Sequence, residues 1–208
     1  MKFLNLLSFL FILPCLSKAQ TAADTAKLPR KYVFTSVEME PEFPGGVNTF
    51  YRYINTNVKY PEVARLLGIN GKVFVSFWVD KSGRVVDVET QPGIGAGCEY
   101  EAKKVVSNCP RWRPGIQNGR PVRVQFNAHV DFNLEKKRVS FKELKDSHYG
   151  FVFNIDGTLC TLDEAQAKLG DTFRQSKIET AEVFYNPDGN TKFDVPDKKE
   201  VYVVKIKS

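Results

Sequence analysis

Two segments in which apolar and polar side chains alternate constrain the fold of this chain most. From Val122 to Phe132 every second residue is apolar, and the residues between them are polar or charged. Successive side chains of a strand point to opposite faces, so Pro121–Phe132 is predicted to be one long strand with a core face and a wet face. Lys72–Val79 alternates in the same way, and Asp80–Gly83 predicts a turn into a second strand at Arg84–Thr90. The long strand comes late in this sheet, so we expect it at an edge.

The outer face of the predicted sheet carries three residues of interest. Phe74 and Trp78 make the second face of their strand apolar, so a helix, a second domain or a partner is expected to cover it. His129 lies on the polar face of the long strand, which favours an exposed strand histidine over a catalytic one.

Helical spacing of apolar residues predicts three helices around this sheet. The first has Val47, Phe50, Tyr51 and Ile54 on one face and ends among residues 55–57. The second is short, with a proline as its first residue and a glycine as its C-cap, over residues 61–68. The third covers residues 99–108. The glycine-rich loop before it, residues 93–97, lacks the spacing of a phosphate-binding loop and is interpreted as a connection.

A second unit is expected after the charged linker 135–138. Its predicted elements are the strand Phe151–Ile155, the helix Leu162–Leu169, the strand Ile178–Tyr185, the turn 186–190 and the strand Val201–Ile206. The fold class predicted for the whole chain is therefore α+β: a domain at residues 36–134 with a small antiparallel sheet and two to three helices, followed by a small α+β module at residues 140–208.

The N-terminus has the pattern of a cleaved secretory signal at residues 1–19. Lys2 precedes an apolar stretch, and Ser17-Lys18-Ala19 is a small-x-small cleavage site. A membrane anchor is the alternative, but the apolar stretch reaches only about 21 Å as a helix against about 30 Å of hydrocarbon. A lipoprotein would need Cys15 as the lipidated residue, and Pro14 before it disfavours that reading. We expect a flexible tail at residues 20–35 and export to the periplasm.

Three cysteines remain after such cleavage. Helix 99–108 would hold Cys98 and Cys109 about 16 Å apart, so no bridge between them is predicted. Whether Cys160 pairs with either of them stays open. No pair of cysteines has the CxxC spacing and the chain has only two histidines, so neither a metal site nor a cofactor is expected.

Charge and motifs exclude other classes of function. The chain has a net charge of +6. Its basic residues are scattered among acidic ones, and this arrangement disfavours nucleic acid as a partner. The segment Phe153–Leu159 resembles the phosphatase signature of the haloacid dehalogenase family, but Asn154 stands where the nucleophilic aspartate is needed. We interpret Asp156-Gly157 as a turn between two strands. An enzyme therefore has the least support.

The segment Val37–Phe132 resembles the C-terminal domain of the TonB family, the periplasmic end of the energy transducers of Gram-negative outer-membrane transport. The residues that carry the resemblance are Pro41-Glu42-Phe43-Pro44-Gly45-Gly46, Tyr60-Pro61 with Ala64 and Gly68, Gly71-Lys72-Val73 through Phe77 with Asp80 and Gly83, Arg111-Trp112-Arg113-Pro114-Gly115, and Arg120-Pro121-Val122-Arg123-Val124. Their order and spacing agree with the family over nearly half of the chain.

The resemblance implies a TonB-dependent outer-membrane receptor as partner, bound through its N-terminal box peptide. The peptide would lie beside the last strand and add to its free edge. The residues that this implies for binding are Asn55, Thr56, Asn57 and Lys59, before Tyr60-Pro61, and Val122, Val124, Phe126, Ala128 and Val130. We expect Tyr60, Pro61, Trp112 and Pro114 to be packing residues rather than contacts.

Two further expectations follow from the resemblance. Transducers of this family have an uncleaved membrane helix that engages inner-membrane motor proteins, and a long Pro-rich spacer, neither of which we expect here. A periplasmic scaffold that holds another envelope protein, without energy transduction, is therefore the alternative function. The segments Ile178–Val183 and Val201–Lys205 are faintly similar to the plug-like modules found with TonB domains.

Overall fold

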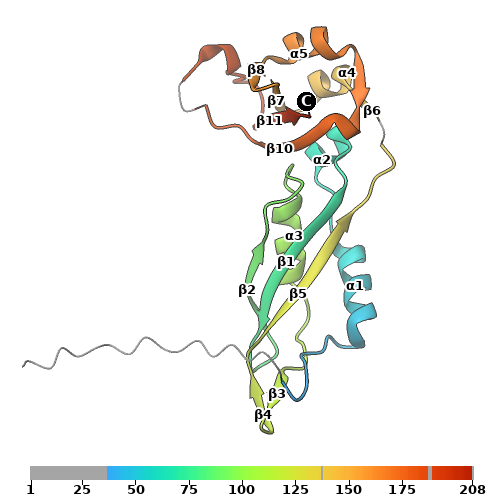
Figure 1. The fold of residues 1–208 in the computed structure, drawn as a ribbon, viewed down its shortest axis with the longest axis vertical. Coiled ribbons are helices and arrows are strands. Elements are labelled where there is room, and N and C mark those ends of the chain that lie inside the picture. Colours follow the sequence, from blue (N-terminus) through green and yellow to red (C-terminus); the bar gives the residue numbers. More distant parts are fainter. Residues whose placement is uncertain (1–36, 137, 187–188, 208) are drawn as a thin grey trace, which may run out of the picture. The chain divides into compact units, whose positions relative to one another are not determined.

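A three-stranded antiparallel sheet organises the first half of the chain. The computed structural model describes residues 37–136, 138–186 and 189–207, so the predicted signal and tail lie outside the described residues. Strands β1 (Gly71–Val79), β2 (Val85–Thr90) and β5 (Val124–Phe132) pair in the order β2-β1-β5, and both pairs are antiparallel (Figure 1). The alternating patterns of β1 and β5 meet in register, since Val73 lies opposite Val130 and Phe77 opposite Phe126. One face of the sheet is thereby apolar across its strands.

The first half has three helices, as the spacing predicts, and α1 and α3 contact strands of this sheet. They are α1 (Gly46–Asn57), α2 (Glu62–Leu67) and α3 (Cys98–Ser107). Helix α1 buries Phe50 and Ile54, whereas Val47 is exposed, contrary to the prediction. Pro61 stands just before α2 as its N-cap and not at its first position, and Gly68 ends the helix in the left-handed conformation with φ 64°.

An aromatic cluster fills the core under the sheet. The ring centroid of Trp112 lies 4.9 Å from that of Phe50, 5.0 Å from that of Phe126 and 5.6 Å from that of Phe43. Tyr60 packs edge-on against Phe132, with centroids 5.5 Å apart. Trp112 and Tyr60 therefore pack against core rings, as expected, and the exclusion of these residues as partner contacts stays a prediction.

The predicted long strand Pro121–Phe132 is wrong at its beginning. Residues Arg120–Val122 form a separate strand, β4, which pairs with β3 (Gly115–Gln117) and not with β1. Asn118 and Gly119 between them both have positive φ, 51° and 66°, as a two-residue turn of type I′ requires. This tight hairpin folds β4 back onto β3, so the strand that joins the main sheet begins only at Val124.

A mixed four-stranded sheet organises the second half. Strands β7 (Gly150–Ile155), β8 (Thr158–Cys160), β10 (Ile178–Val183) and β11 (Val201–Ile206) pair in the order β10-β11-β7-β8, with β11 parallel to β7. Asp156 and Gly157 form the turn from β7 to β8, both with positive φ, which confirms the turn interpretation. Helix α5 (Leu162–Leu169) has the predicted bounds and begins with a capping box between Thr161 and Glu164.

Several short elements of this half were not predicted. They are β6 (Arg138–Ser140), α4 (Phe141–Asp146), β9 (Thr172–Arg174) and the 3₁₀ turns Gln175–Lys177 and Thr191–Phe193. Strand β6 begins within the predicted linker and pairs with β9, and Phe141, Phe153 and Phe173 form the core beneath them. Both halves combine helices with small sheets, so the α+β fold class is confirmed. The division into residues 36–134 and 140–208 stays a prediction.

Candidate functional site

The outer edge of β5 is the feature of the first half that could bind an extended chain. Strand β5 pairs with β1 along its whole length, from Val79 opposite Val124 to Gly71 opposite Phe132. Within residues 37–136, 138–186 and 189–207, no strand pairs with its other side. An edge strand presents unpaired backbone N–H and C=O groups there, which are a template for a further strand. The predicted edge position is confirmed.

Most of the predicted contact residues of this strand face the core. Ala128 and Val130 are buried, Phe126 packs against Trp112, and Val124 is half-buried. These residues could therefore offer a partner their backbone groups but little side-chain surface. Val122 lies in β4, outside the edge.

The side chains that border the edge on the outer face were not among the predicted contacts. Gln125 and Asn127 are exposed, and His129 is half-buried. The alternation that placed their neighbours in the core also places these three outside, so the sequence carried the necessary signal.

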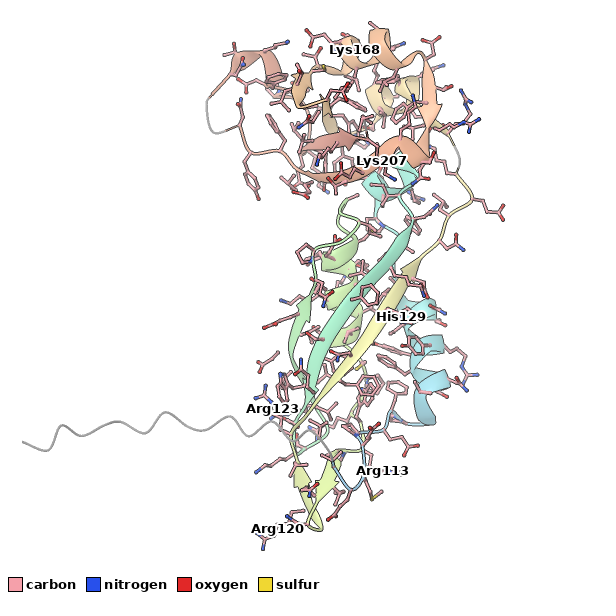
Figure 2. The ribbon with its side chains drawn as sticks, viewed as in Figure 1. Arg113, Arg120, Arg123, His129, Lys168 and Lys207 are labelled. Atoms are coloured by element: carbon pink, nitrogen blue, oxygen red, sulfur yellow. The ribbon has the colours of Figure 1, made fainter. Side chains whose placement is uncertain are left out.

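His129 is the centre of a cluster on the outer face. Its Nδ1 lies 3.5 Å from the Tyr51 hydroxyl of α1, and its Nε2 lies 3.4 Å from Oδ2 of Asp131. Asp131 also pairs with Lys72 of β1 at 3.1 Å, and the Phe74 ring centroid lies 6.5 Å from the imidazole. Figure 2 shows His129 on β5 beside α1. His129 therefore lies on the outer face, as predicted, but it is half-buried rather than exposed, because side chains contact it from both sides.

The second apolar face of β1 is covered only in part. Trp78 is 7% exposed, and the guanidinium of Arg123 lies 4.6 Å from its ring centroid. Arg123, at the break between β4 and β5 (Figure 2), is also ion-paired with Asp87 of β2. Phe74 remains 53% exposed. In the part of the chain that the structure describes, the same domain thus covers Trp78 but leaves Phe74 partly exposed.

The other predicted contacts lie at the end of α1. Asn55, Thr56 and Asn57 form its last turn, where Thr56 Oγ1 donates to the Arg52 carbonyl and Asn57 Nδ2 to the Tyr53 carbonyl, both at 2.8 Å. All three are exposed. Helix α1 contacts β5 one turn earlier, through the rings of Phe50 and Tyr51.

Lys59 is positioned by a residue that the sequence reasoning missed. Its backbone N–H donates to Glu101 Oε1 at 3.0 Å, and Glu101 Oε2 lies 3.4 Å from the Lys104 ammonium. Glu101 is 8% exposed, the only buried charged residue among those described. It stands four residues before Val105, on the inward face of the predicted helix, and that spacing could have revealed it.

The thiols of Cys98 and Cys109 are unreactive. Burial raises the pKa of the Cys98 thiol to about 12 and also raises that of Cys109, so neither forms a thiolate readily. The structure places Cys98 at the beginning of α3 and Cys109 after its end, as predicted.

Among the described residues, no three His, Cys, Asp or Glu side chains are grouped to hold a metal ion. No helix in this part of the chain is long and apolar enough to cross a membrane.

Residues 56–134 match the family model described as the Gram-negative bacterial TonB protein C-terminal. This region is a TonB-family C-terminal domain. The match begins in the last turn of α1 and includes the whole three-stranded sheet, the hairpin β3–β4 and helix α3. TonB C-terminal domains are non-enzymatic protein-interaction domains of the bacterial cell envelope.

Solved structures of TonB C-terminal domains are similar to a part of the chain. The solution structure from Helicobacter pylori is 19% identical, covers 43% of this chain and 94% of that chain, and has a TM-score of 0.34. The one from Pseudomonas aeruginosa is 26% identical, covers 38% and 80%, and has a TM-score of 0.31. A search of curated protein sequences finds no significant match. The assignment of the TonB domain therefore rests on the sequence match over residues 56–134.

Proposed function

We propose that this protein is a non-enzymatic TonB-type protein of the periplasm that binds a TonB-dependent outer-membrane receptor and supports energised transport. The receptor's box peptide would add as a strand to the outer edge of β5. The observation that carries the proposal is the unpaired edge of β5 within a TonB-family domain. Backbone hydrogen bonds would supply the affinity, which fits an edge whose apolar side chains are turned into the core.

Two neighbouring features support this choice of site. Gln125 and Asn127 border the edge with polar groups that can contact alternate side chains of an added peptide. The segment 55–59 consists of the last turn of α1, the helix that packs beside β5, and the two residues after it, and Glu101 holds this segment through the Lys59 N–H. In this proposal Asn55–Lys59 contacts the receptor close to its box peptide.

Strand addition can be tested with a synthetic box peptide of a TonB-dependent receptor, titrated into the isotope-labelled full chain. Two N-methylated versions of the peptide are compared, one modified at odd and one at even positions. Only one set of amides can face β5, so one version should lose binding and the other should keep it. Equal binding of both versions would exclude backbone pairing, and this comparison needs no change in the protein.

Proline substitutions test whether the binding site lies on β5. Val124→Pro and Phe126→Pro remove a ladder donor and bend the strand, and each should weaken peptide binding at least tenfold. Glu89→Pro, on the opposite edge strand β2, is the matched control and should leave binding unchanged. Circular dichroism identifies any variant that has lost its fold. Normal binding by both folded β5 variants would move the site elsewhere.

A scaffold that holds another envelope protein, without energy transduction, is the second candidate. The exposed Phe74 on the outer face favours it, because an apolar ring of this size next to His129 suits a protein interface. Phe74→Ser should weaken capture of such a partner and leave box-peptide binding intact. A loss of peptide binding in this variant would instead assign Phe74 to the receptor site.

The role in transport depends on processing of the N-terminus, which the proposal takes to be a cleaved signal at residues 1–19. The intact mass of the protein from fractionated cells measures processing and location together. A soluble species that starts at Gln20 supports a periplasmic adaptor. A full-length species in the inner membrane would support an anchored transducer that engages motor proteins.

A further inference from the structure

A cavity in the second half of the chain has the composition of a small-molecule site. Its volume is about 470 Å³, within the range of about 300–1,000 Å³ typical of ligand pockets. It is bounded by the end of α4, the beginning of β7, the beginning of α5 and the segment 192–198. Its apolar lining consists of Leu144, Tyr149, Phe151, Val152, Leu162, Phe193 and Val195.

The polar lining of this cavity is mainly cationic. Lys145, Lys192 and Lys198 all border it, against a single carboxylate, Asp163. Lys145 is paired with Asp163 at 2.7 Å, and Lys192 is paired with Glu164 at 2.9 Å. The charge of each of these two lysines is therefore neutralised by its own carboxylate partner.

Lys198 differs from the other two lysines. Its ammonium donates to two backbone carbonyl oxygens, that of Lys145 at 3.0 Å and that of Ser147 at 2.5 Å. The ion pairs found among the described residues give it no carboxylate partner. An ammonium group has three donors, so one remains after these two bonds. The carbonyls fix the positive charge beside an apolar cavity, where a charge without a counter-ion is unfavourable.

We infer that this cavity binds a small amphiphilic anion, with an apolar body among the buried side chains and one carboxylate-type head group at Lys198. The apolar lining selects the body, and the fixed charge of Lys198 selects an anion over a cation or a neutral molecule. The cavity is built entirely from residues 144–198, so this activity goes beyond receptor binding at β5 and does not depend on it.

Decanoate, used below its micellar concentration, is a suitable probe. It should bind to the labelled full chain with one-to-one stoichiometry and shift amide resonances of residues 149–152 and 192–198. Decanol and decyltrimethylammonium have the same apolar chain with a neutral and a cationic head, and each should bind at least tenfold more weakly. Equal affinity for all three, or shifts spread over the chain, would overturn the proposal. So would binding to phosphatidylglycerol vesicles without binding of decanoate.

Variants of the lining separate the two parts of the site. Leu162→Trp fills the cavity from the first residue of α5 and should abolish decanoate binding. Lys198→Met keeps the aliphatic stem but removes the charge, and it should weaken decanoate about tenfold while leaving decanol unchanged. Lys142→Met, an exposed lysine of α4 that does not line the cavity, is the matched control. Wild-type affinity in Leu162→Trp would exclude the cavity, and wild-type selectivity in Lys198→Met would exclude its head-group role.

Discussion

The backbone N–H of Lys59 donates a 3.0 Å hydrogen bond to Oε1 of Glu101, a carboxylate on the buried side of α3. This bond joins the segment after α1 to a helix that follows forty residues later in the chain. Because Glu101 also pairs with Lys104, its charge is compensated although it is buried. Glu101 thus ties the end of the segment that we propose as part of the receptor site to α3.

Replacing Glu101 should loosen this segment. Glu101→Ala leaves the Lys59 N–H without its partner and should lower the free energy of unfolding by about 1–3 kcal/mol, measured by urea denaturation. Amide exchange at Lys59 should become faster. Glu89→Ala, an exposed acid of β2, is the control and should change stability by less than about 0.5 kcal/mol. Equal stability of the two variants would show that the Lys59–Glu101 bond contributes nothing.

Arg123 should control the exposure of Trp78. Arg123→Met removes the guanidinium from the ring, so acrylamide should quench the tryptophan fluorescence more strongly and stability should fall by about 0.5–1 kcal/mol. The measurement is resolved best in a Trp112→Phe background, where Trp78 is the only fluorophore of its kind. Arg123→Lys keeps the charge and the pairing with Asp87 but not the planar stacking, so it should give an intermediate result. Unchanged quenching in Arg123→Met would mean that other groups cover the ring.

The hairpin between β3 and β4 depends on backbone conformation at its turn. Gly119 has φ 66°, and a Cβ there would meet nothing within 4 Å, so Gly119→Ala should cost only the conformational penalty of about 1–2 kcal/mol. Asn118→Gly should be close to neutral, since glycine also adopts the φ of 51° found at Asn118. Thermal unfolding of the two variants measures whether Gly119→Ala is the less stable one. A Gly119→Ala variant as stable as the wild type would contradict the turn assignment.

Asp80 should make the β1–β2 turn sensitive to acid. Its carboxylate accepts hydrogen bonds from the Ser82 hydroxyl at 2.6 Å and from the Ser82 and Arg84 backbone at 2.8 and 3.0 Å. The Ser82 hydroxyl, followed by the backbone donors, holds the pKa of Asp80 well below its ordinary value of 3.8. A lowered folded-state pKa stabilises the fold above the unfolded-state value, and this contribution is lost as the pH falls through the folded-state pKa.

The Asp80→Asn variant tests the direction of this pH dependence of stability. The wild type should exceed it in stability at neutral pH, and the difference should shrink progressively below about pH 4. Urea denaturation at several pH values measures the difference. Asp156→Asn, in the β7–β8 turn, is the control for the loss of one surface carboxylate. A difference that grows toward acid pH would reverse the assignment.

Long, strongly patterned segments were predictable from the sequence, and short ones were not. Helix α5 has its predicted bounds because Thr161 and Glu164 form a capping box and Gly170 follows the last helical residue. Strand β5 shows its two faces over enough residues for the alternation to be clear. By contrast, β6 and β9 have three residues each, too few for any periodicity, and α4 has only Phe141 and Leu144 as buried positions.

The errors at the site came from local chemistry that competed with the pattern. Asn118-Gly119 is a strong hairpin signal, but the apolar alternation after it obscured this signal, and the predicted strand Pro121–Phe132 began three residues before β5 does. The spacing within α3 places Glu101 on the inward face, but its role depends on the backbone N–H of Lys59, a donor distant in the sequence that this spacing does not reveal. The same holds for the contact between Tyr51 and His129.

The position of β11 has a consequence for when the chain can fold. Residues 201–206 come late in the sequence, yet they form an inner strand of the second sheet, between β10 and β7, and their pairing with β7 spans about fifty residues. This sheet cannot close until those residues have left the ribosome, because its two halves have no other strand to join them. A nascent chain therefore keeps this half open during synthesis, and the side of β7 that receives β11 stays unpaired until residue 206 is free.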